Sequence, residues 1–503
     1  MIIDTAMDGP AIRLLEVRSW RMPIFSIDYF FAACRKTGPG KLSGKLILST
    51  TIQLTAKPIK APVSRRPLPT GANVHICNDS RKVSTVRNFR ISNGKAVILL
   101  LSLVILSGCK RRRLTTPTPQ MDIEQQFWVK VLLIDKVEAC TLKIASSFSI
   151  TDDPNLQTQL PTARFDQIDA PINIRLINGE ISIGARPFMN DEVIIFPDEP
   201  YIFELNGEAY RGKLKLIINP EGGTFDAINL VPPDAYLAGV VGAEMPNYWE
   251  PEALKAQAIA ARTYCFYIKK RFGGNHTWDM KKTAAHQVYR GVSAESTQIW
   301  EAVNQTKGQV LVCKQTDGTE NIFPAYYSST CGGHTENSKN VFGDSFEPLI
   351  GVPCPYCRNV ARPKFFFWPM IQFDNTYVIN RLLRRYPNLK RLGKITNFSP
   401  AEQSNYKEFS RLTKVELSGS NGKSDFLRAE DFRLAIDPTG RKLRSTICQI
   451  VKLGEKWAFL SGRGWGHGVG MCQCGAQGMA RQGKNAKQIL SYYYPDSKII
   501  SVY

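Results

Sequence analysis

The sequence lacks an apolar run long enough to cross a membrane as a helix. Its most apolar stretch, residues 96–106, has about 11 residues, whereas a membrane-spanning helix needs about 20. Cysteine is also sparse: twelve cysteines in 503 residues exclude a scaffold held together mainly by disulfides. The sequence has no internal repeat and no DNA- or RNA-binding motif. These absences leave a globular, non-repetitive protein.

The positive charge of the chain is concentrated in its N-terminal part. The formal net charge is +21, and residues 1–113 hold 20 of the 65 Lys and Arg but only 5 of the 44 Asp and Glu. The rest of the chain therefore carries a surplus of only six positive charges. A mildly basic globular part suits an anionic wall or lipid surface and does not require nucleic acid. We predict no nucleic acid among the partners.

Residues 1–125 are predicted to be a leader and a tether. Basic residues precede the apolar stretch, as they do in a secretory signal. The stretch runs into Leu106-Ser-Gly-Cys109, which resembles a bacterial lipobox with a lipidated cysteine. We therefore expect an exported lipoprotein of the cell envelope that is anchored to a membrane through Cys109, with residues 110–125 as a solvated tether. The alternative is a buried helix or strand with an incidental cysteine.

The chain after the tether is predicted to have an α+β fold that begins with a β-rich region. Over residues 126–230, short alternating apolar runs such as Ile172–Ile177 and Lys213–Ile218 are typical of antiparallel strands. Turn residues such as Asn206-Gly207 separate these runs.

Residues 231–503 are predicted to form a second domain, in which helices carry the functional segment. Asp234, which follows Pro232-Pro233, is predicted to be the N-cap of a first helix that Pro246 ends, and Pro251 suits the first turn of a second helix. Near the C-terminus, the glycines of residues 462–470 allow the backbone to approach another segment closely. We expect this Gly-rich block to pack on the helices.

Several blocks of this second domain are similar to one known protein family. In chain order they are Tyr236–Pro246 and Glu252–Tyr264, then Tyr326–Ser329 with Gly332-Gly333 and Thr335-Glu336, and finally Gly462–Met471 with Gln473, Gly475–Gly478 and Tyr492–Pro495. Together they resemble the stage II sporulation protein D (SpoIID)/amidase-enhancer family over roughly residues 200–503.

This resemblance implies an enzyme that acts on peptidoglycan. The sporulation member of the family is a lytic transglycosylase, which cleaves the bond between N-acetylmuramic acid and N-acetylglucosamine, leaves a 1,6-anhydro end and prefers strands without stem peptides. Its catalytic residue is the Glu of a Glu-Met-Pro block, which corresponds to Glu244 here. Other members enhance an amidase, so the alternative is a wall-binding module without activity of its own that has an amidase as its partner.

A single glutamate is enough for this chemistry. A hydrolytic glycosidase generally needs two carboxyl groups, whereas in a lytic transglycosylase the sugar's own C6 hydroxyl is the nucleophile. Glu244 would protonate the glycosidic oxygen and would need a raised pKa to hold that proton near neutral pH. Without the resemblance, a carboxylate at the unfavourable end of a helix would be interpreted as a surface residue.

Further residues are candidates for binding the glycan. A buried guanidinium at Arg262 could bind sugar or orient the carboxylate, and a tyrosine face such as that of Tyr327 stacks on sugar rings. The alternatives are solvated helix positions, strand-end packing and, for His467, a satisfied core histidine. The full set of candidates is Lys255, Gln257, Arg262, Tyr327, Ser328, Ser329, His467 and Gln473.

Two short motifs predict a structural zinc site. Cys331-Gly-Gly-His334 and Cys354-Pro-Tyr-Cys357 pair ligands at the spacing of zinc knuckles, although the chemistry itself requires no cofactor. The alternatives are a disulfide and, from another class, a metal-dependent hydrolase at Cys331 and His334. Cys472 and Cys474 are two buried thiols or, with His467, a second metal or redox group.

Overall fold

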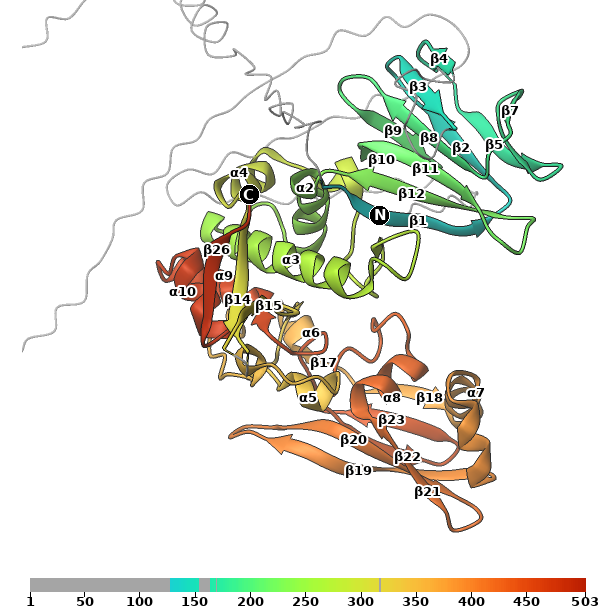
Figure 1. Cartoon of the computed structure of the whole chain (residues 1–503). Coiled ribbons are helices and arrows are strands. Elements are labelled where there is room, and N and C mark those ends of the chain that lie inside the picture. Colours follow the sequence, from blue (N-terminus) through green and yellow to red (C-terminus); the bar gives the residue numbers. More distant parts are fainter. Residues whose placement is uncertain (1–126, 153–162, 169, 316–317) are drawn as a thin grey trace, which may run out of the picture. The chain divides into compact units, whose positions relative to one another are not determined.

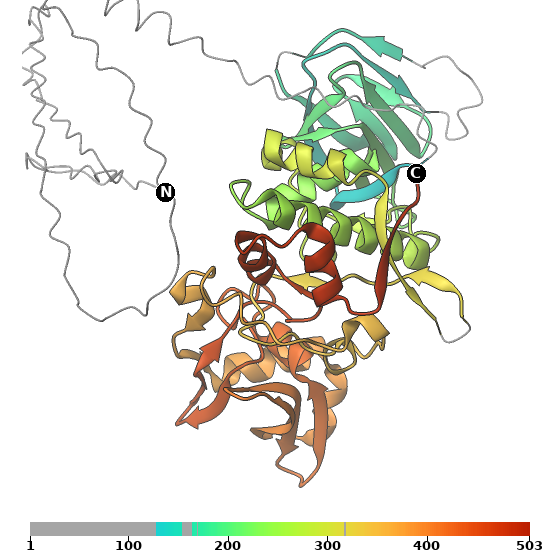
Figure 2. The same ribbon diagram turned by 90° about the vertical axis from the view of Figure 1, so that its left-hand side faces the viewer.

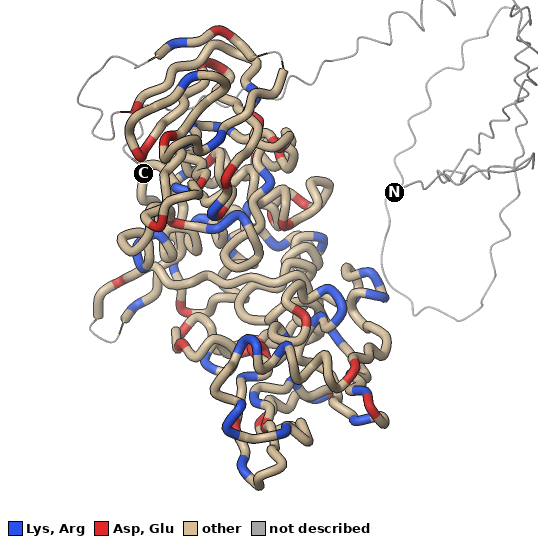
Figure 3. The backbone as a smooth tube through the Cα atoms, turned by 90° about the vertical axis from the view of Figure 1, so that its right-hand side faces the viewer, with Lys and Arg blue, Asp and Glu red and all other residues tan. Residues whose placement is uncertain are grey.

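The computed structural model describes residues 127–152, 163–168, 170–315 and 318–503 (Figure 1). The predicted leader and Cys109 lie outside the described residues. Within the described ranges, no helix is both long enough and apolar enough to cross a membrane. Basic and acidic residues are interspersed along this part of the chain (Figure 3).

The N-terminal region consists of strands, as the alternating apolar runs predicted, and the α+β class is confirmed. Side chains of both its sheets, such as Val131, Leu142 and Leu216, enter one apolar core. The seven-stranded sheet has the order β13 (Met280–Lys281), β1 (Val129–Val137), β12 (Phe225–Val231), β11 (Lys213–Ile218), β8 (Glu192–Pro197), β3 (Phe148–Thr151), β4 (Ala163–Phe165). The six-stranded sheet has the order β10 (Glu208–Arg211), β9 (Ile202–Leu205), β2 (Ala139–Lys143), β5 (Ile172–Ile177), β6 (Glu180–Ile183), β7 (Arg186–Phe188).

Two helices follow the sheets. The second begins at Pro251 as predicted, whereas the first begins at Pro233, so that Pro232 and not the predicted Asp234 is its N-cap. The helix α2 (Pro233–Glu244) is apolar on most sides and is buried between other elements, and Gly242 lets it approach the turn η1 (Gly291–Ala294) closely. A Cβ at Gly242 would lie 1.9 Å from the carbonyl oxygen of Ala294, so only glycine fits there. Next to α2 lie α3 (Pro251–Phe272) and α4 (Thr297–Gln305). The sheet of β15 (Glu320–Ile322), β14 (Gln309–Lys314) and β26 (Ser497–Ser501) packs on α3.

Residues 368–459 surround a second apolar core, which includes Leu382, Val415 and Trp457. The long hairpin of β19 and β20 and the helices α7 and α8 supply most of its side chains. Its elements are β18 (Ile371–Asp374), α7 (Asn375–Arg385), η3 (Pro387–Leu392), β19 (Ile395–Asn405), β20 (Ser410–Gly419), β21 (Ser424–Arg428), α8 (Ala429–Ile436), β22 (Gln449–Leu453) and β23 (Lys456–Leu460).

The Gly-rich block connects this part of the chain to the C-terminal helices, which pack on α3 (Figure 2). Gly470 takes a positive φ, and a Cβ there would lie 2.0 Å from the carbonyl oxygen of Tyr326. This close approach lets two segments far apart in the sequence run side by side as parallel strands. The elements are β16 (Tyr327–Ser328), α5 (Ser338–Val341), η2 (Glu347–Leu349), α6 (Pro363–Phe366), β17 (Phe367–Trp368), β24 (Gly462–Arg463), β25 (Met471–Cys472), α9 (Gln473–Arg481) and α10 (Ala486–Tyr493).

Candidate active site

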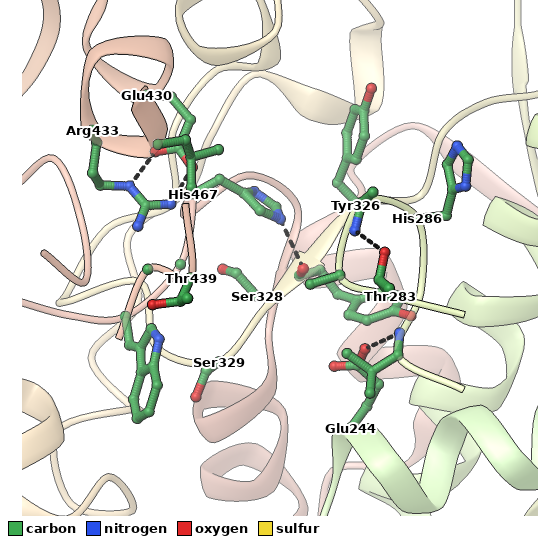
Figure 4. Close-up of a pocket in the computed structure, with 18 of the residues that line it drawn as sticks. Glu244, Thr283, His286, Tyr326, Ser328, Ser329, Glu430, Arg433, Thr439 and His467 are labelled. Carbon is green, nitrogen blue, oxygen red and sulfur yellow. Dashed lines mark hydrogen bonds and ion pairs between the residues drawn. The ribbon is translucent and has the colours of Figure 1, made fainter. Parts of the chain in front are cut away.

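A pocket of about 760 Å³ brings together residues from the sequence blocks that carry the family resemblance. Glu244, at the end of α2, lies on one side, and Glu430 and Arg433 of α8 lie on the other (Figure 4). The loop of residues 283–288 and strand β16 complete much of the wall. The lining also includes Tyr264, Tyr326, Tyr327, Ser328, Ser329, Phe342, Arg385, Thr439, Trp465, His467 and Gln473.

Two hydrogen bonds hold the carboxylate of Glu244. The backbone N–H of Val288 donates to Oε1 at 3.1 Å, and Nε2 of Gln473 donates to Oε2 at 3.3 Å. Part of the side chain faces the pocket, but the surrounding residues shield the carboxyl group from solvent. This burial raises the pKa of Glu244, and the two hydrogen bonds and the charge of Arg290 oppose the shift only in part. A carboxyl group that holds its proton above the usual range is suited to act as a general acid.

The second carboxylate of the pocket has the opposite electrostatic setting. Burial acts to raise the pKa of Glu430, but the adjoining guanidinium of Arg433 outweighs it and holds that pKa below the usual range. Nε of Arg433 donates to Glu430 at 2.9 Å, and Nη1 donates to the carbonyl oxygen of Leu443 at 2.8 Å. Glu430 is therefore an ion-paired carboxylate, and Glu244 is the group able to deliver a proton. The pairing of Arg433 with Glu430, three residues earlier, was not predicted from the sequence.

Tyr327 lines the pocket, and its hydroxyl belongs to a buried network. Its hydroxyl accepts a hydrogen bond from Nε2 of Gln287 at 2.8 Å, and Oε1 of Gln287 accepts one from the hydroxyl of Tyr236 at 3.0 Å. Burial, with the nearby charge of Glu244, raises the pKa of Tyr327 well above its usual value, so the phenol stays neutral. Gln287 was not predicted, since it lies in a loop whose sequence gives no sign of this contact.

Ser328 and Ser329, two of the candidates predicted for glycan binding, line the pocket. The hydroxyl of Ser328 is buried and has no hydrogen-bond partner among the described residues. A buried polar atom without a partner costs free energy, and a ligand that bonds to it recovers that cost. This hydroxyl is therefore available to a polar ligand.

His467 lies at the pocket wall as a neutral, satisfied histidine. Its Nδ1 accepts a hydrogen bond from the backbone N–H of Val469 at 3.0 Å, which leaves Nε2 to donate to the carbonyl oxygen of Tyr327 at 2.9 Å. Burial lowers the pKa of His467 to about 4. The side chain therefore fixes the Gly-rich block against β16 and has no free nitrogen to exchange a proton.

Three candidates on α3 do not reach the pocket. Arg262 is fully buried, where its Nη2 bonds Asp234 at 2.9 Å and its Nη1 bonds the carbonyl oxygen of Thr306 at 2.7 Å. Gln257 is fully buried in the helix packing, and Lys255 pairs with Glu252 on the helix surface at 2.7 Å. The prediction that these side chains contact the glycan is corrected accordingly: in the structure they bond within the protein or pack inside it.

The predicted metal ligands also need one correction. Cys331, Cys354 and Cys357 do come together, but the fourth member of their group is Cys472 in place of His334. These four residues are referred to below as the four-cysteine cluster. His334 instead bonds the carbonyl oxygen of Thr335 through Nδ1 at 2.6 Å and stacks on Tyr406. All four cysteines are free thiols, so no disulfide joins them.

The raised pKa of Glu244 predicts how stability depends on pH. Because the folded-state pKa lies above the unfolded one, the wild type loses stability as pH rises through the folded pKa. Glu244→Gln, which cannot ionise, should therefore unfold at a higher temperature than the wild type at neutral pH. Below the unfolded-state pKa of about 4.3, Glu244 is protonated in both the folded and the unfolded protein. The difference in Tm between the variant and the wild type should then vanish. Thermal unfolding across this pH range measures it; a Tm difference that does not change with pH would contradict the assignment.

Comparison with known proteins adds independent findings. A family described as "Stage II sporulation protein" matches residues 221–313. Over 290 residues the chain is 30% identical to stage II sporulation protein D of Bacillus subtilis, which covers 54% of this chain and 76% of that protein. Over 366 residues it is 30% identical to the amidase enhancer of Bacillus subtilis, covering 65% of this chain and 50% of that protein. An uncharacterized protein of Brachyspira hyodysenteriae is 32% identical over 298 residues, or 59% of this chain and 74% of that protein.

Proposed function

Because the chain belongs to the stage II sporulation protein D family, we propose that it is a lytic transglycosylase of the cell envelope that cleaves peptidoglycan glycan strands. Membership of this family supports a general function related to the cell wall. The single observation that carries the finer proposal is the state of Glu244. It is the pocket carboxyl group whose pKa is raised and that forms no ion pair with another described residue.

The proposed reaction needs only this carboxyl group. Protonated Glu244 gives its proton to the glycosidic oxygen as the bond to the anomeric carbon of N-acetylmuramic acid breaks, which releases the N-acetylglucosamine hydroxyl. The carboxylate then takes the proton of the C6 hydroxyl, whose oxygen bonds to the anomeric carbon and closes the 1,6-anhydro ring. Atoms balance without water, and Glu244 ends protonated as it began.

The surroundings of Glu244 suit this sequence. Burial favours the protonated carboxyl group before cleavage, while the donors Val288 and Gln473 stabilise the carboxylate that forms during it. The paired Glu430 is not free to activate a water molecule, which a hydrolytic mechanism would require. The pocket therefore favours attack by the sugar's own hydroxyl.

The rest of the pocket suits a sugar. The unpartnered hydroxyl of Ser328 and the neighbouring Ser329 offer hydrogen bonds, and Trp465 offers an aromatic surface. We propose glycan strands without stem peptides as the substrate, a preference that rests on the family resemblance. Export and a lipid anchor at Cys109 would place the enzyme at the membrane surface beside this substrate.

A second candidate function is favoured by the similarity to the amidase enhancer: the protein would bind the wall and stimulate an amidase without cleaving glycan itself. Digestion of purified, peptide-free glycan strands by the wild type and by Glu244→Gln separates the two functions. The enzyme is expected to release soluble fragments, whereas the variant binds strands and releases none. Binding by both proteins without release by either would favour the enhancer, provided that each protein also speeds an amidase acting on peptidoglycan that still carries its stem peptides.

Gln473→Ala tests how Glu244 is tuned. Its amide donates to the charged form of the carboxyl group, so removing it should raise the pKa of Glu244 further and move the alkaline limb of the pH–rate profile upward. A hydrogen bond worth about 1 kcal/mol corresponds to a shift of somewhat under one pH unit. Gln482→Ala, at an exposed position just after the same helix, is the control and should leave the profile unchanged. An alkaline limb that stays in place, or moves down, would contradict the role of Gln473.

A further inference from the structure

Four cysteines from three distant parts of the chain meet in the core behind the pocket. Cys331 follows β16, Cys354 and Cys357 lie in the loop that follows η2, and Cys472 lies in β25. All four side chains are buried, and their sulfur atoms lie within 4.8 Å of one another. We propose that this four-cysteine cluster binds one structural zinc ion.

The distances fit a single tetrahedral ion. Sγ of Cys331 and Sγ of Cys357 are 3.8 Å apart. Zinc–sulfur bonds of about 2.3 Å place the corners of a regular tetrahedron about 3.8 Å apart, whereas the sulfur atoms of a disulfide are about 2.05 Å apart. A cluster of several irons and sulfides would hold the thiolates farther apart, because its own atoms lie between them. Four thiolates around one ion are typical of structural zinc.

The surroundings stabilise sulfur atoms that carry negative charge. The backbone N–H of Cys331 points at Sγ of Cys472 at 3.2 Å, and the hydroxyl of Tyr493 lies 3.1 Å from Sγ of Cys354. Cys472 is also the N-cap of α9, where the helix dipole favours an anion. Such donors around the sulfur atoms are the outer interactions that orient metal ligands and moderate their charge.

Other buried cysteines of the chain show what an ordinary core thiol looks like. Cys140 and Cys265 are buried in apolar packing, and neither belongs to a group of metal-ligating side chains among the described residues. Cys474, two residues after Cys472, accepts a hydrogen bond from Thr330 and does not belong to the cluster either. Convergence of four thiols is therefore a property of this one place and not of cysteine burial in general.

The position of the cluster gives the ion a structural role. Cys472 pairs with Ser328 across β16 and β25, and the next residue, Gln473, donates to Glu244. An ion bound to Cys331 and Cys472 would therefore fix the two strands that carry one wall of the pocket. Because four protein thiolates complete a tetrahedron, no position remains for a water molecule, so the ion would not activate a nucleophile.

Metal analysis of the full chain, purified under reducing conditions from cells supplied with zinc, tests the proposal. We expect about one zinc per chain and, by X-ray absorption at the zinc edge, four sulfur ligands at about 2.3 Å. Cys357→Ser should lose most of this zinc. His334→Ala and Cys474→Ser, which alter a predicted ligand and a neighbouring thiol outside the cluster, should keep it.

The absorption measurement uses the unaltered chain, so the proposal can fail even where Cys357→Ser does not fold. Three sulfur ligands with one nitrogen, iron in place of zinc, absence of a stoichiometric metal, or two fewer free thiols because of a disulfide would each overturn it. The inference does not depend on the proposed reaction. Glu244→Gln should retain its zinc whether or not the protein cleaves glycan.

Discussion

Glu244→Gln is expected to lower the rate of glycan cleavage by about a hundred- to ten-thousandfold, the range that general acid–base catalysis contributes. Gln keeps the shape of the side chain and a hydrogen-bond acceptor for Val288, but it has no proton to give to the glycosidic oxygen. Because the change removes transition-state stabilisation and leaves most binding contacts, kcat should fall while KM changes little. Release of soluble glycan over time measures the rate.

Glu250→Gln is the matched control for this variant. It makes the same chemical change six residues later in the chain, at an exposed side chain outside the pocket. It should cleave at the wild-type rate. Equal activity of Glu244→Gln and the wild type would contradict the assignment of the acid, and equal loss in both variants would point to an effect of charge on wall binding.

Arg262→Met is expected to destabilise the protein by about 3 to 5 kcal/mol, the cost of breaking a buried ion pair by removing one partner. The guanidinium connects α2 and α3 to the turn after α4 through Asp234 and the carbonyl oxygens of Val303 and Thr306. Methionine fills the space but leaves these acceptors without their donor. Unfolding in urea should show a lower midpoint with little change in slope.

Lys255→Met is the comparison for this effect, since Lys255 pairs with Glu252 on the surface of the same helix. An ion pair of that kind contributes about 1 kcal/mol or less. If Arg262→Met kept wild-type stability and instead lost affinity for glycan, this result would support the original prediction that Arg262 contacts the substrate. If both variants were equally destabilised, the buried bonds of Arg262 would not explain its role.

The elements of the fold followed from local patterns. Alternating apolar residues in Ile172–Ile177 and Lys213–Ile218 correspond to β5 and β11 residue for residue, and Pro251 begins α3. These signals depend on neighbours within a few residues, which a sequence contains directly. The separate apolar core of residues 368–459 was not predicted, because contacts between distant segments define it.

The pKa shifts of the site could not be predicted from the sequence, because they also depend on contacts between distant segments. Position alone made Glu244 a surface carboxylate at a helix end. Its environment depends on Val288 and Gln473, which are 44 and 229 residues away in the chain. A rule of helix periodicity could place Arg262 on α3 but not reveal which carbonyl oxygens face it.

The four-cysteine cluster illustrates the limit of spacing rules. The spacing of Cys331 and His334 matches that of ligands in zinc knuckles, so His334 was predicted to bind the same ion as Cys331. The parallel pairing of β16 and β25 brings Cys472 to that place, while His334 turns toward Tyr406. A parallel strand pair between residues 327 and 472 leaves no local signature in the sequence.

The chemical nature of the new chain ends tests the central claim most directly. Peptide-free glycan strands are cleaved by the wild type in water enriched in ¹⁸O, and the products are weighed by mass spectrometry before and after treatment with borohydride. If Glu244 directs attack by the C6 hydroxyl, every new muramic acid end is a 1,6-anhydro sugar that contains no solvent oxygen and resists reduction. New ends that carry ¹⁸O and are reduced by borohydride would show that water is the nucleophile and would contradict the account.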